Sequence, residues 1–347
     1  MGEQIKLRNS SVELLRILCM MFIVMHHIII TTVAPQFSSA VYNAFDTVFH
    51  TAVVIFVIIS GYYGINFKVN KLVKLWAQVA YYSVLAGLIA FFVLHSIDIK
   101  SLAGCFFPIY TRPYWFVSAY VELFLFSPIL NIVAQKASRR QLMAGILVLM
   151  FSTWAFPTDL LSGTGLPVFS MLYLVGRYMA QYKADSYKNN KQVALCLVFL
   201  IAVITMLGII CPPQSRLFYT YLGLCYRYYS IGTLLLSLLI FLFFRNMVFH
   251  SKVINYMAGS VFAIYLIHEN HLVSQYTYEM PVRWLMTEGL PSGLAMVIVA
   301  FALVLFCVGF DQMRIMIFKL CDPFFAFVER IILKAYQKFV TVFKLAE

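Results

Sequence analysis

Long apolar segments separated by short polar joints run through almost the whole chain. A helix needs about 20 apolar residues to cross the hydrocarbon core of a bilayer, and ten windows approach or reach that length. They lie at residues 12–33, 41–62, 72–94, 114–134, 142–157, 166–182, 192–211, 226–244, 254–277 and 292–317. The pattern predicts an all-α integral membrane fold with about ten transmembrane helices, which form one domain over residues 1–317.

A different pattern begins after the last window, in residues 318–347. Apolar side chains recur there at steps of three and four residues, and basic side chains fall largely on the opposite side of a helix. The apolar positions are Phe324, Val328, Ile331, Ala335, Phe339 and Val342, and the basic ones are Arg330, Lys334 and Lys338. We expect a cytoplasmic amphipathic helix that lies on the inner leaflet, with a plain continuation of the last transmembrane helix as the alternative.

Lysine and arginine are distributed unevenly between the joints. Cytoplasmic loops of membrane proteins are enriched in both residue types. When ten helices are drawn through the windows, 21 of the 26 basic residues fall on one side of the membrane, and both termini belong to that side. The sequence therefore predicts that both termini are cytoplasmic.

Composition narrows the classes of function. The 347 residues are 62% apolar and 12% charged, and the mean hydropathy of +0.86 lies outside the usual range of soluble domains. A net charge of +12 would suggest nucleic-acid binding in a soluble protein, but these basic residues flank the membrane, where anionic headgroups attract them. We expect no nucleic-acid partner. The seven cysteines show no metal-ligand spacing, and we expect no metal.

The first window carries ionisable residues, which are costly in an apolar helix. At about 100° per residue, Glu13, Arg16 and His27 fall within an arc of about 60°, whereas His26 lies about 80° or more from each of them. Arg16 and His27 are eleven residues apart, or about 16 Å along a helix. With a cytoplasmic N-terminus, Arg16 is expected at the cytoplasmic mouth and His27 near or slightly outside the midplane.

Two interpretations of these residues remain open. Arg16 could extend to the headgroups, and His27 could be a core residue that hydrogen-bonds a neighbouring helix. Alternatively, the imidazole takes a proton from a hydroxyl near neutral pH, and an acid on the same helix face indicates a polar channel. Glu13 is placed to pair with Arg16 one turn away. His26 lies away from the other three, and we expect it to be structural.

The same residues resemble a known family. SVELLRILCMMFIVMHH, residues 11–27, contains an acidic residue, an arginine three positions on and a histidine eleven further, and this arrangement resembles the membrane-bound acyltransferase 3 family. IFVIISGYYG at 55–64 resembles the family's Phe-x-x-x-Ser-Gly-Tyr signature. FKVNKLVKLW at 67–76 is similar to its basic stretch, with lysines at 71 and 74 in place of arginines. PYWFVSAYVELFLFSPILN at 113–131 and VFAIYLIHEN at 261–270 resemble two later motifs.

The resemblance implies transfer of an acyl group, commonly acetyl from acetyl-CoA, to a hydroxyl of a glycan or another envelope molecule. In the family the arginine and histidine of the first helix are regarded as catalytic, so we expect His27, Arg16 and the neighbouring Glu13 to be the catalytic residues. The basic residues Arg16, Lys68, Lys71 and Lys74 would hold the phosphates of coenzyme A. His27 would act as a general base or accept the acyl group itself, and the sequence leaves both mechanisms open.

Further residues of the matching motifs are expected to bind the acceptor. Aromatic side chains stack on sugars, although they also form ordinary belts at membrane interfaces. Gly61 permits either close approach of another backbone or the end of a helix. The expected substrate-binding residues are Ser60, Tyr62, Trp115, Tyr120, His268 and Glu269.

The main alternative function is a transporter or flippase of an envelope glycan or lipid intermediate. Such proteins often contain duplicated halves or paired broken helices, and the sequence shows neither. The motifs are similar to those of enzymes that modify bacterial capsules and exopolysaccharides. The expected location is therefore the bacterial cytoplasmic membrane, and the expected partners are an acyl-CoA donor, a polysaccharide or glycolipid acceptor and the lipid bilayer. The sequence does not indicate an oligomeric state.

Overall fold

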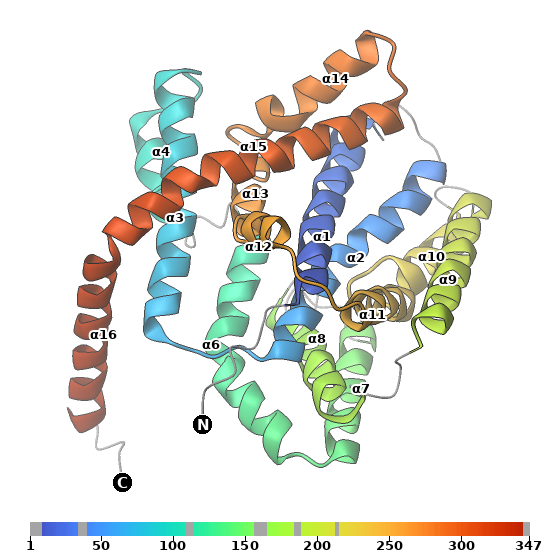
Figure 1. The fold of residues 1–347 in the computed structure, drawn as a ribbon, viewed down its shortest axis with the longest axis horizontal. Helices are drawn as coiled ribbons and strands as arrows, with labels where there is room; N and C mark the ends of the chain where they lie inside the picture. Colours follow the sequence, from blue (N-terminus) through green and yellow to red (C-terminus); the bar gives the residue numbers. More distant parts are fainter. Residues whose placement is uncertain are drawn as a thin grey trace.

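The fold is a bundle of helices (Figure 1). The computed structural model describes residues 9–33, 40–108, 114–155, 165–183, 189–211 and 215–342, and every regular element within these ranges is helical. The first half contains α1 (Ser10–Ile28), the π-helical turn η1 (Ile29–Val33), α2 (Ala40–Tyr63), α3 (Val69–Phe92), α4 (Ile99–Gly104), α6 (Trp115–Lys136), α7 (Arg139–Ala155), α8 (Leu166–Tyr178) and η3 (Met179–Lys183). The second half contains α9 (Asn190–Ile210), α10 (Arg216–Cys225), α11 (Ile231–Asn246), α12 (Lys252–Ala258), α13 (Val261–His268), η4 (Gln275–Glu279), α14 (Met280–Thr287), α15 (Ser292–Leu320) and α16 (Asp322–Val342).

Six helical segments within these ranges are long and apolar enough to cross a membrane. They are Ser10–Val33, Ala44–Tyr63, Val69–Phe92, Trp115–Lys136, Asn190–Ile210 and Ser292–Leu320, and they make the chain a multi-pass membrane protein. The windows at 142–157, 166–182 and 226–244 correspond to the shorter helices α7, α8 and α11. The count of ten crossings and the cytoplasmic position of the termini stay predictions.

The ninth apolar window is not one continuous helix. Residues 254–277 are divided among α12, α13 and the beginning of η4, with a turn at Gly259 and Ser260 between the first two. An apolar window does not distinguish a continuous helix from a broken one, because both are buried in apolar surroundings. The break matters for function, since α13 ends at His268 and brings this residue and Glu269 against α1.

Helix α1 lies in the middle of the bundle, with α2 beside it (Figure 1). Helices α2 and α8 approach so closely that only glycine fits between their backbones. A Cβ atom added at Gly61 would lie 2.1 Å from the carbonyl oxygen of Tyr173, and one at Gly176 would lie 2.4 Å from that of Ile58. Gly61 therefore serves close approach, and the end of α2 falls at Gly64, whose φ of 76° suits glycine.

Helix α15 contains a buried ion pair, and a tyrosine of α3 is bound to it. The carboxylate of Asp311 is fully buried and accepts two hydrogen bonds from Arg314, at 2.6 and 2.7 Å. The Tyr82 hydroxyl of α3 donates to the same carboxylate at 2.5 Å. The bonds between Asp311 and Arg314 satisfy charges that would be costly to bury alone. The bond from Tyr82 fixes the C-terminal part of α15 against α3.

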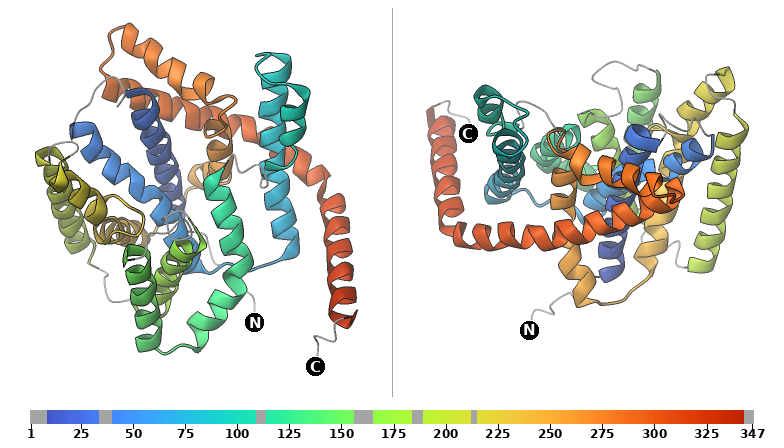
Figure 2. Two further views of the ribbon diagram at one scale, coloured as in Figure 1. Left: turned by 180° about the vertical axis from the view of Figure 1, so that it is seen from behind. Right: turned by 90° about the horizontal axis from the view of Figure 1, so that it is seen from above.

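The amphipathic tail forms a separate helix. The chain turns at Cys321, and α16 leaves in a new direction along the edge of the molecule (Figures 1 and 2). Its first turns are bound to the start of α3, because Lys74 pairs with Asp322 at 2.6 Å and Asn70 donates to Glu329 at 3.2 and 3.3 Å. The alternative of a plain continuation of α15 is therefore wrong, while the position of α16 on a membrane surface stays a prediction.

Candidate active site

The C-terminal end of α1 carries the two adjacent histidines. There α1 passes into the π-helical turn η1, and the Thr31 hydroxyl donates to the carbonyl oxygen of His27 at 2.8 Å. A π-helical turn widens the helix by one residue and often occurs at functional sites. The imidazoles of His26 and His27 lie with ring centres 5.3 Å apart.

The imidazole of His27 is held from one side only. Its Nδ1 atom lies 2.9 Å from a carboxylate oxygen of Glu269 and 3.1 Å from Nε2 of His268. A carboxylate accepts hydrogen bonds, so Nδ1 of His27 carries the proton. His268 is fully buried, and its own Nδ1 donates to the carbonyl oxygen of Ile264 at 2.6 Å, which leaves its Nε2 as an acceptor. In neutral His27 the lone pair is therefore on Nε2, which has no hydrogen-bond partner among the described residues.

A cavity of about 500 Å³ lies beside these groups. It is lined by side chains of α1, α2, α6 and the segment around α13 and η4, and we call it the histidine cavity. Among its lining residues are His26, His27, His50, Trp115 and Glu269. Trp115 of α6 forms part of an aromatic wall, because its ring stacks on Tyr228 with centres 5.6 Å apart. The cavity thus combines a base held by a carboxylate with flat aromatic surfaces.

A second cavity of about 500 Å³ follows the N-terminal half of α1, and we call it the Arg16 cavity. Glu13, Arg16, Ser60, Lys71 and Tyr120 are among its lining residues. The Arg16 guanidinium donates to the Glu13 carboxylate at 2.8 Å, which confirms the predicted pairing. Residues of the predicted face of α1 therefore line cavities, with the Glu13–Arg16 ion pair at one cavity and His27 at the next.

The two cavities are neighbours. Ile23 of α1, Phe116 of α6 and Tyr265 of α13 line both of them. Among the described residues, no other side chain lines both cavities. A ligand long enough to pass them would connect Arg16 with His27.

The predicted basic residues of α3 are placed unequally. Lys71 lines the Arg16 cavity and also a basic hollow of about 420 Å³, where it is joined by Lys74, Arg314 and Lys319. Lys74 is paired with Asp322 in that hollow. Lys68 is exposed and lies outside both cavities.

The expected acceptor residues divide between the two cavities. Trp115 and Glu269 line the histidine cavity, whereas Ser60 and Tyr120 line the Arg16 cavity. Tyr62 lies outside both and packs its ring against Phe241, with centres 5.0 Å apart. His268 is also not a lining residue, since it stands behind His27 and supports it.

Sequence reasoning missed the partner of His26. Its Nδ1 lies 2.5 Å from a carboxylate oxygen of Asp46 on α2, and His26 lines the histidine cavity, although we expected a structural role. A signal was available, because Asp46 is the only acidic residue in the window 41–62 and an isolated carboxylate in an apolar window indicates function.

The spacing of His27, His268 and Glu269 would also suit a metal ion. One ligand atom each of His27, His268 and Glu269 lies within 4.8 Å of the others. The hydrogen bonds described above use the same atoms, so the cluster is already satisfied by its own protons. A metal ion and these hydrogen bonds exclude each other, because a metal on Nδ1 of His27 would displace the proton that fixes this ring.

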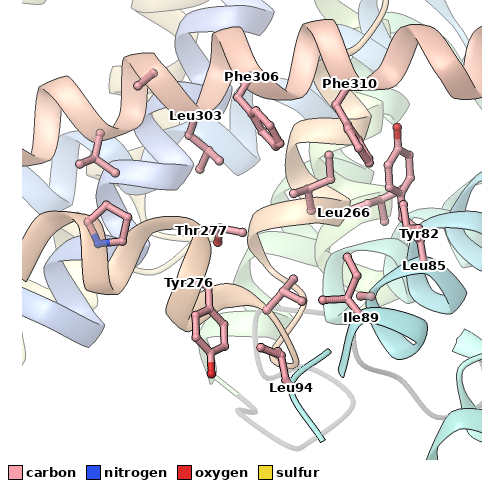
Figure 3. Close-up of a pocket in the computed structure, with 16 residues that line it drawn as sticks. Tyr82, Leu85, Ile89, Leu94, Leu266, Tyr276, Thr277, Leu303, Phe306 and Phe310 are labelled. Carbon is pink, nitrogen blue, oxygen red and sulfur yellow. The ribbon is translucent and has the colours of Figure 1, made fainter. Parts of the chain in front are cut away.

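An apolar groove of about 630 Å³ lies on the other side of α13, between α3, η4 and α15 (Figure 3). Leu266, Leu303 and Phe306 are typical of its lining (Figure 3). The described residues that line it include no imidazole, carboxylate or amine. It therefore lacks the acid–base groups that the histidine cavity contains.

Comparison with protein families gives one match. The model of the acyltransferase 3 family, described as an acyltransferase domain, matches residues 9–311, and this range includes every lining residue of both cavities. Comparison with curated proteins gives no match, and comparison with solved structures gives none either. The family match covers most of the chain and agrees with a site that holds a base ready to act on a hydroxyl. The chain therefore belongs to the acyltransferase 3 family, whose members transfer an acyl group to a hydroxyl.

Proposed function

We propose that this enzyme transfers an acetyl group from cytoplasmic acetyl-CoA to a hydroxyl of an envelope or extracellular polysaccharide, in the cytoplasmic membrane of a bacterium. The observation that carries the proposal is the order of the two cavities along α1. Cationic groups line the first, a carboxylate-held imidazole lines the second, and three side chains separate them. This order suits a polyanionic thioester that enters at one end and an acceptor that enters at the other.

The donor is expected at the Arg16 cavity. Coenzyme A carries phosphates, and the guanidinium of Arg16 and the ammonium of Lys71 provide positive charge there. Glu13 offsets part of the Arg16 charge and holds the guanidinium in place. The long, uncharged arm of the donor then reaches past Ile23 and Phe116, so that the thioester carbonyl arrives beside His27.

The reactive atom is Nε2 of His27. Glu269 holds the Nδ1 proton, so the Nε2 lone pair is directed away from that carboxylate and is available for reaction. It can remove the proton of the acceptor hydroxyl, or it can attack the thioester carbon itself. In both cases the positive charge that develops on the ring is stabilised by the Glu269 carboxylate at 2.9 Å.

The acceptor is expected in the histidine cavity. Trp115 and Tyr228 offer flat apolar faces, on which the C–H side of a sugar ring packs well. Hydrogen bonds are sufficient to explain the contacts among His27, His268 and Glu269, and we propose a metal-free reaction. The donor, the acceptor class and the membrane location all stand as parts of this proposal.

The test uses purified enzyme, acetyl-CoA labelled in the acetyl group and glycan extracted from the bacterial envelope. Replacement of the proposed reactive group, His27→Gln, should lower the rate of label transfer by roughly 10²–10⁴-fold, the usual contribution of a positioned acid–base group. The control is His95→Asn, because His95 is exposed in a loop and has a φ of 49° that asparagine tolerates. This variant should transfer label at the wild-type rate.

Two results would contradict the proposal. Equal labelling by wild type and His27→Gln would remove His27 from the mechanism. No labelling by the folded wild type would favour a transporter of the glycan, which a flux assay without acetyl-CoA can detect.

A further inference from the structure

Two neighbouring histidines of one helix face the same cavity. Adjacent residues point about 100° apart, so a small site beside one of them would normally leave the other outside. Here both His26 and His27 line the histidine cavity. His27 points along the face of α1 that carries Arg16, whereas His26 is turned toward α2 and meets Asp46.

The contacts of His26 repeat those of His27. Nδ1 of His26 lies 2.5 Å from one oxygen of the Asp46 carboxylate, so Nδ1 carries the proton and the lone pair of the neutral ring is on Nε2. The other oxygen of Asp46 accepts a hydrogen bond from the Tyr226 hydroxyl at 2.8 Å. Asp46 is itself buried. Each histidine is therefore fixed by its own carboxylate, with Nε2 left for the cavity.

A third imidazole borders the pair. The ring of His50 is stacked between Tyr226 and Tyr228, with centres 4.3 and 4.1 Å away, and its centre lies 5.1 Å from that of His26. Nδ1 of His50 is buried and has no partner among the described residues. A buried nitrogen without a partner is costly. The ring of His50 lines the histidine cavity beside His26, so this part of the cavity wall consists of imidazole and tyrosine rings.

These observations give His26 a role that His27 cannot fill alone. If Nε2 of His27 attacks the thioester, that atom then carries the acyl group and is unable to take the acceptor proton. A second base is required within reach of the same acyl carbon. The neighbouring imidazole, with its ring centre 5.3 Å away and its own carboxylate, meets this requirement.

We propose that His26, oriented by Asp46, is a second catalytic residue that removes the proton of the acceptor hydroxyl, while His27 carries the acyl group. This inference rests on the proposed function. In the first step Nε2 of His27 bonds to the acyl carbon, the carbon–sulfur bond breaks and coenzyme A leaves as the thiolate. The acylated ring is cationic and is stabilised by Glu269.

The second step restores the enzyme. The acceptor oxygen attacks the acyl carbon, its proton passes to Nε2 of His26, and the carbon–nitrogen bond breaks with its electron pair returning to His27. The proton on His26 balances the thiolate formed in the first step, so that the net products are an ester and a thiol. Asp46 stabilises the cationic His26 ring, and the Tyr226 hydroxyl holds Asp46.

The test compares two acceptors on the same variants. The glycan hydroxyl needs a base, whereas hydroxylamine attacks acyl groups as a neutral amine and depends on a base much less. For His26→Gln we expect glycan labelling to fall by roughly 10²-fold or more. Labelling of hydroxylamine should fall far less, so the ratio of the two rates should drop. His27→Gln should lose both reactions, because no acyl group is taken from the thioester.

The matched control is Thr47→Val. Thr47 is buried next to Asp46 on α2, and its hydroxyl lies 2.7 Å from that of Tyr221, outside the histidine cavity. Its replacement disturbs the same part of the helix but should leave the ratio of glycan to hydroxylamine labelling unchanged. A ratio that falls in His26→Gln alone identifies a base rather than a structural residue.

Each other result overturns the inference. An unchanged glycan rate in His26→Gln would show that His26 is not needed, and an equal loss with both acceptors would show a structural role. In either case the wild-type activity would leave the proposed function intact. If the wild type labels neither acceptor, the proposed function fails and this inference fails with it.

Discussion

At the scale of single residues, the site depends on which nitrogen of each imidazole carries a proton. Glu269 and Asp46 lie at the Nδ1 atoms of His27 and His26, so both rings are held in the same tautomer. A third group, His268, is fixed through the carbonyl oxygen of Ile264 and leaves an acceptor toward His27. Hydrogen bonds are therefore sufficient to explain these short contacts.

This assignment predicts how the enzyme responds to removal of metal. Dialysis against a chelator should leave acetyl transfer unchanged, because the atoms of His27, His268 and Glu269 are joined by hydrogen bonds. Metal analysis of the purified protein should find no stoichiometric zinc. Loss of activity on chelation that returns on addition of Zn²⁺ would instead assign a metal to the three residues.

The residues that could be predicted were those linked by helix geometry. Glu13, Arg16 and His27 share one helix, so the rotation of 100° per residue places them without knowledge of the fold. Asp46 and His268 are separated from their partners by 20 and 241 residues, and only the packing of α2 and α13 against α1 brings them together. One prediction differs from the structure by a single position, because Tyr63 lines the Arg16 cavity whereas the predicted Tyr62 faces α11.

At the scale of the elements, the contact between α2 and α8 sets the position of the Arg16 cavity wall. Gly61 and Gly176 allow the two backbones to touch, and Ser60, next to Gly61, lines the cavity. The hydroxyl of Tyr173 on α8 accepts from the backbone N–H of Ile65 at 2.9 Å and donates to Asn131 of α6 at 2.7 Å. Close packing at one pair of glycines thus orders three helices around the Arg16 cavity.

We predict that Gly61→Ala destabilises the protein. The new Cβ would lie 2.1 Å from the backbone oxygen of Tyr173, which no side-chain rotation can relieve, and overpacking of this kind costs about 1–3 kcal/mol or more. The melting temperature in detergent should fall. The control is Gly309→Ala in α15, where nothing lies within 4 Å of the added atom, and its melting temperature should stay the same or rise. Equal stability of Gly61→Ala and wild type would contradict the close approach.

The helices were predictable where one apolar window formed one element. α1, α2, α3, α6, α9 and α15 follow their windows to within a few residues. The ninth window failed because apolar side chains also cover the turn at Gly259, and the hydropathy pattern does not report that turn. The short helix that results is the one that ends at His268, so the broken element contributes to the candidate site.

At the scale of the whole molecule, the proposed reaction assigns one cavity to the donor and the other to the acceptor. The cationic Arg16 cavity and the aromatic histidine cavity lie in succession along α1, and Ile23, Phe116 and Tyr265 line both. In the proposed function, this order would let a soluble donor and an external acceptor react without either one crossing the membrane. The family match fixes the reaction class, and the direction of transfer is part of the proposal.

The most direct test of this account is the sidedness of transfer. The enzyme is placed in sealed vesicles whose outer face carries both termini, as verified by protease cleavage of a C-terminal tag. Labelled acetyl-CoA is added outside, and the acceptor glycan is trapped inside. The account predicts that label appears on the trapped glycan with the wild type and not with His27→Gln. Label that appears only when the glycan is supplied on the same side as acetyl-CoA would contradict it.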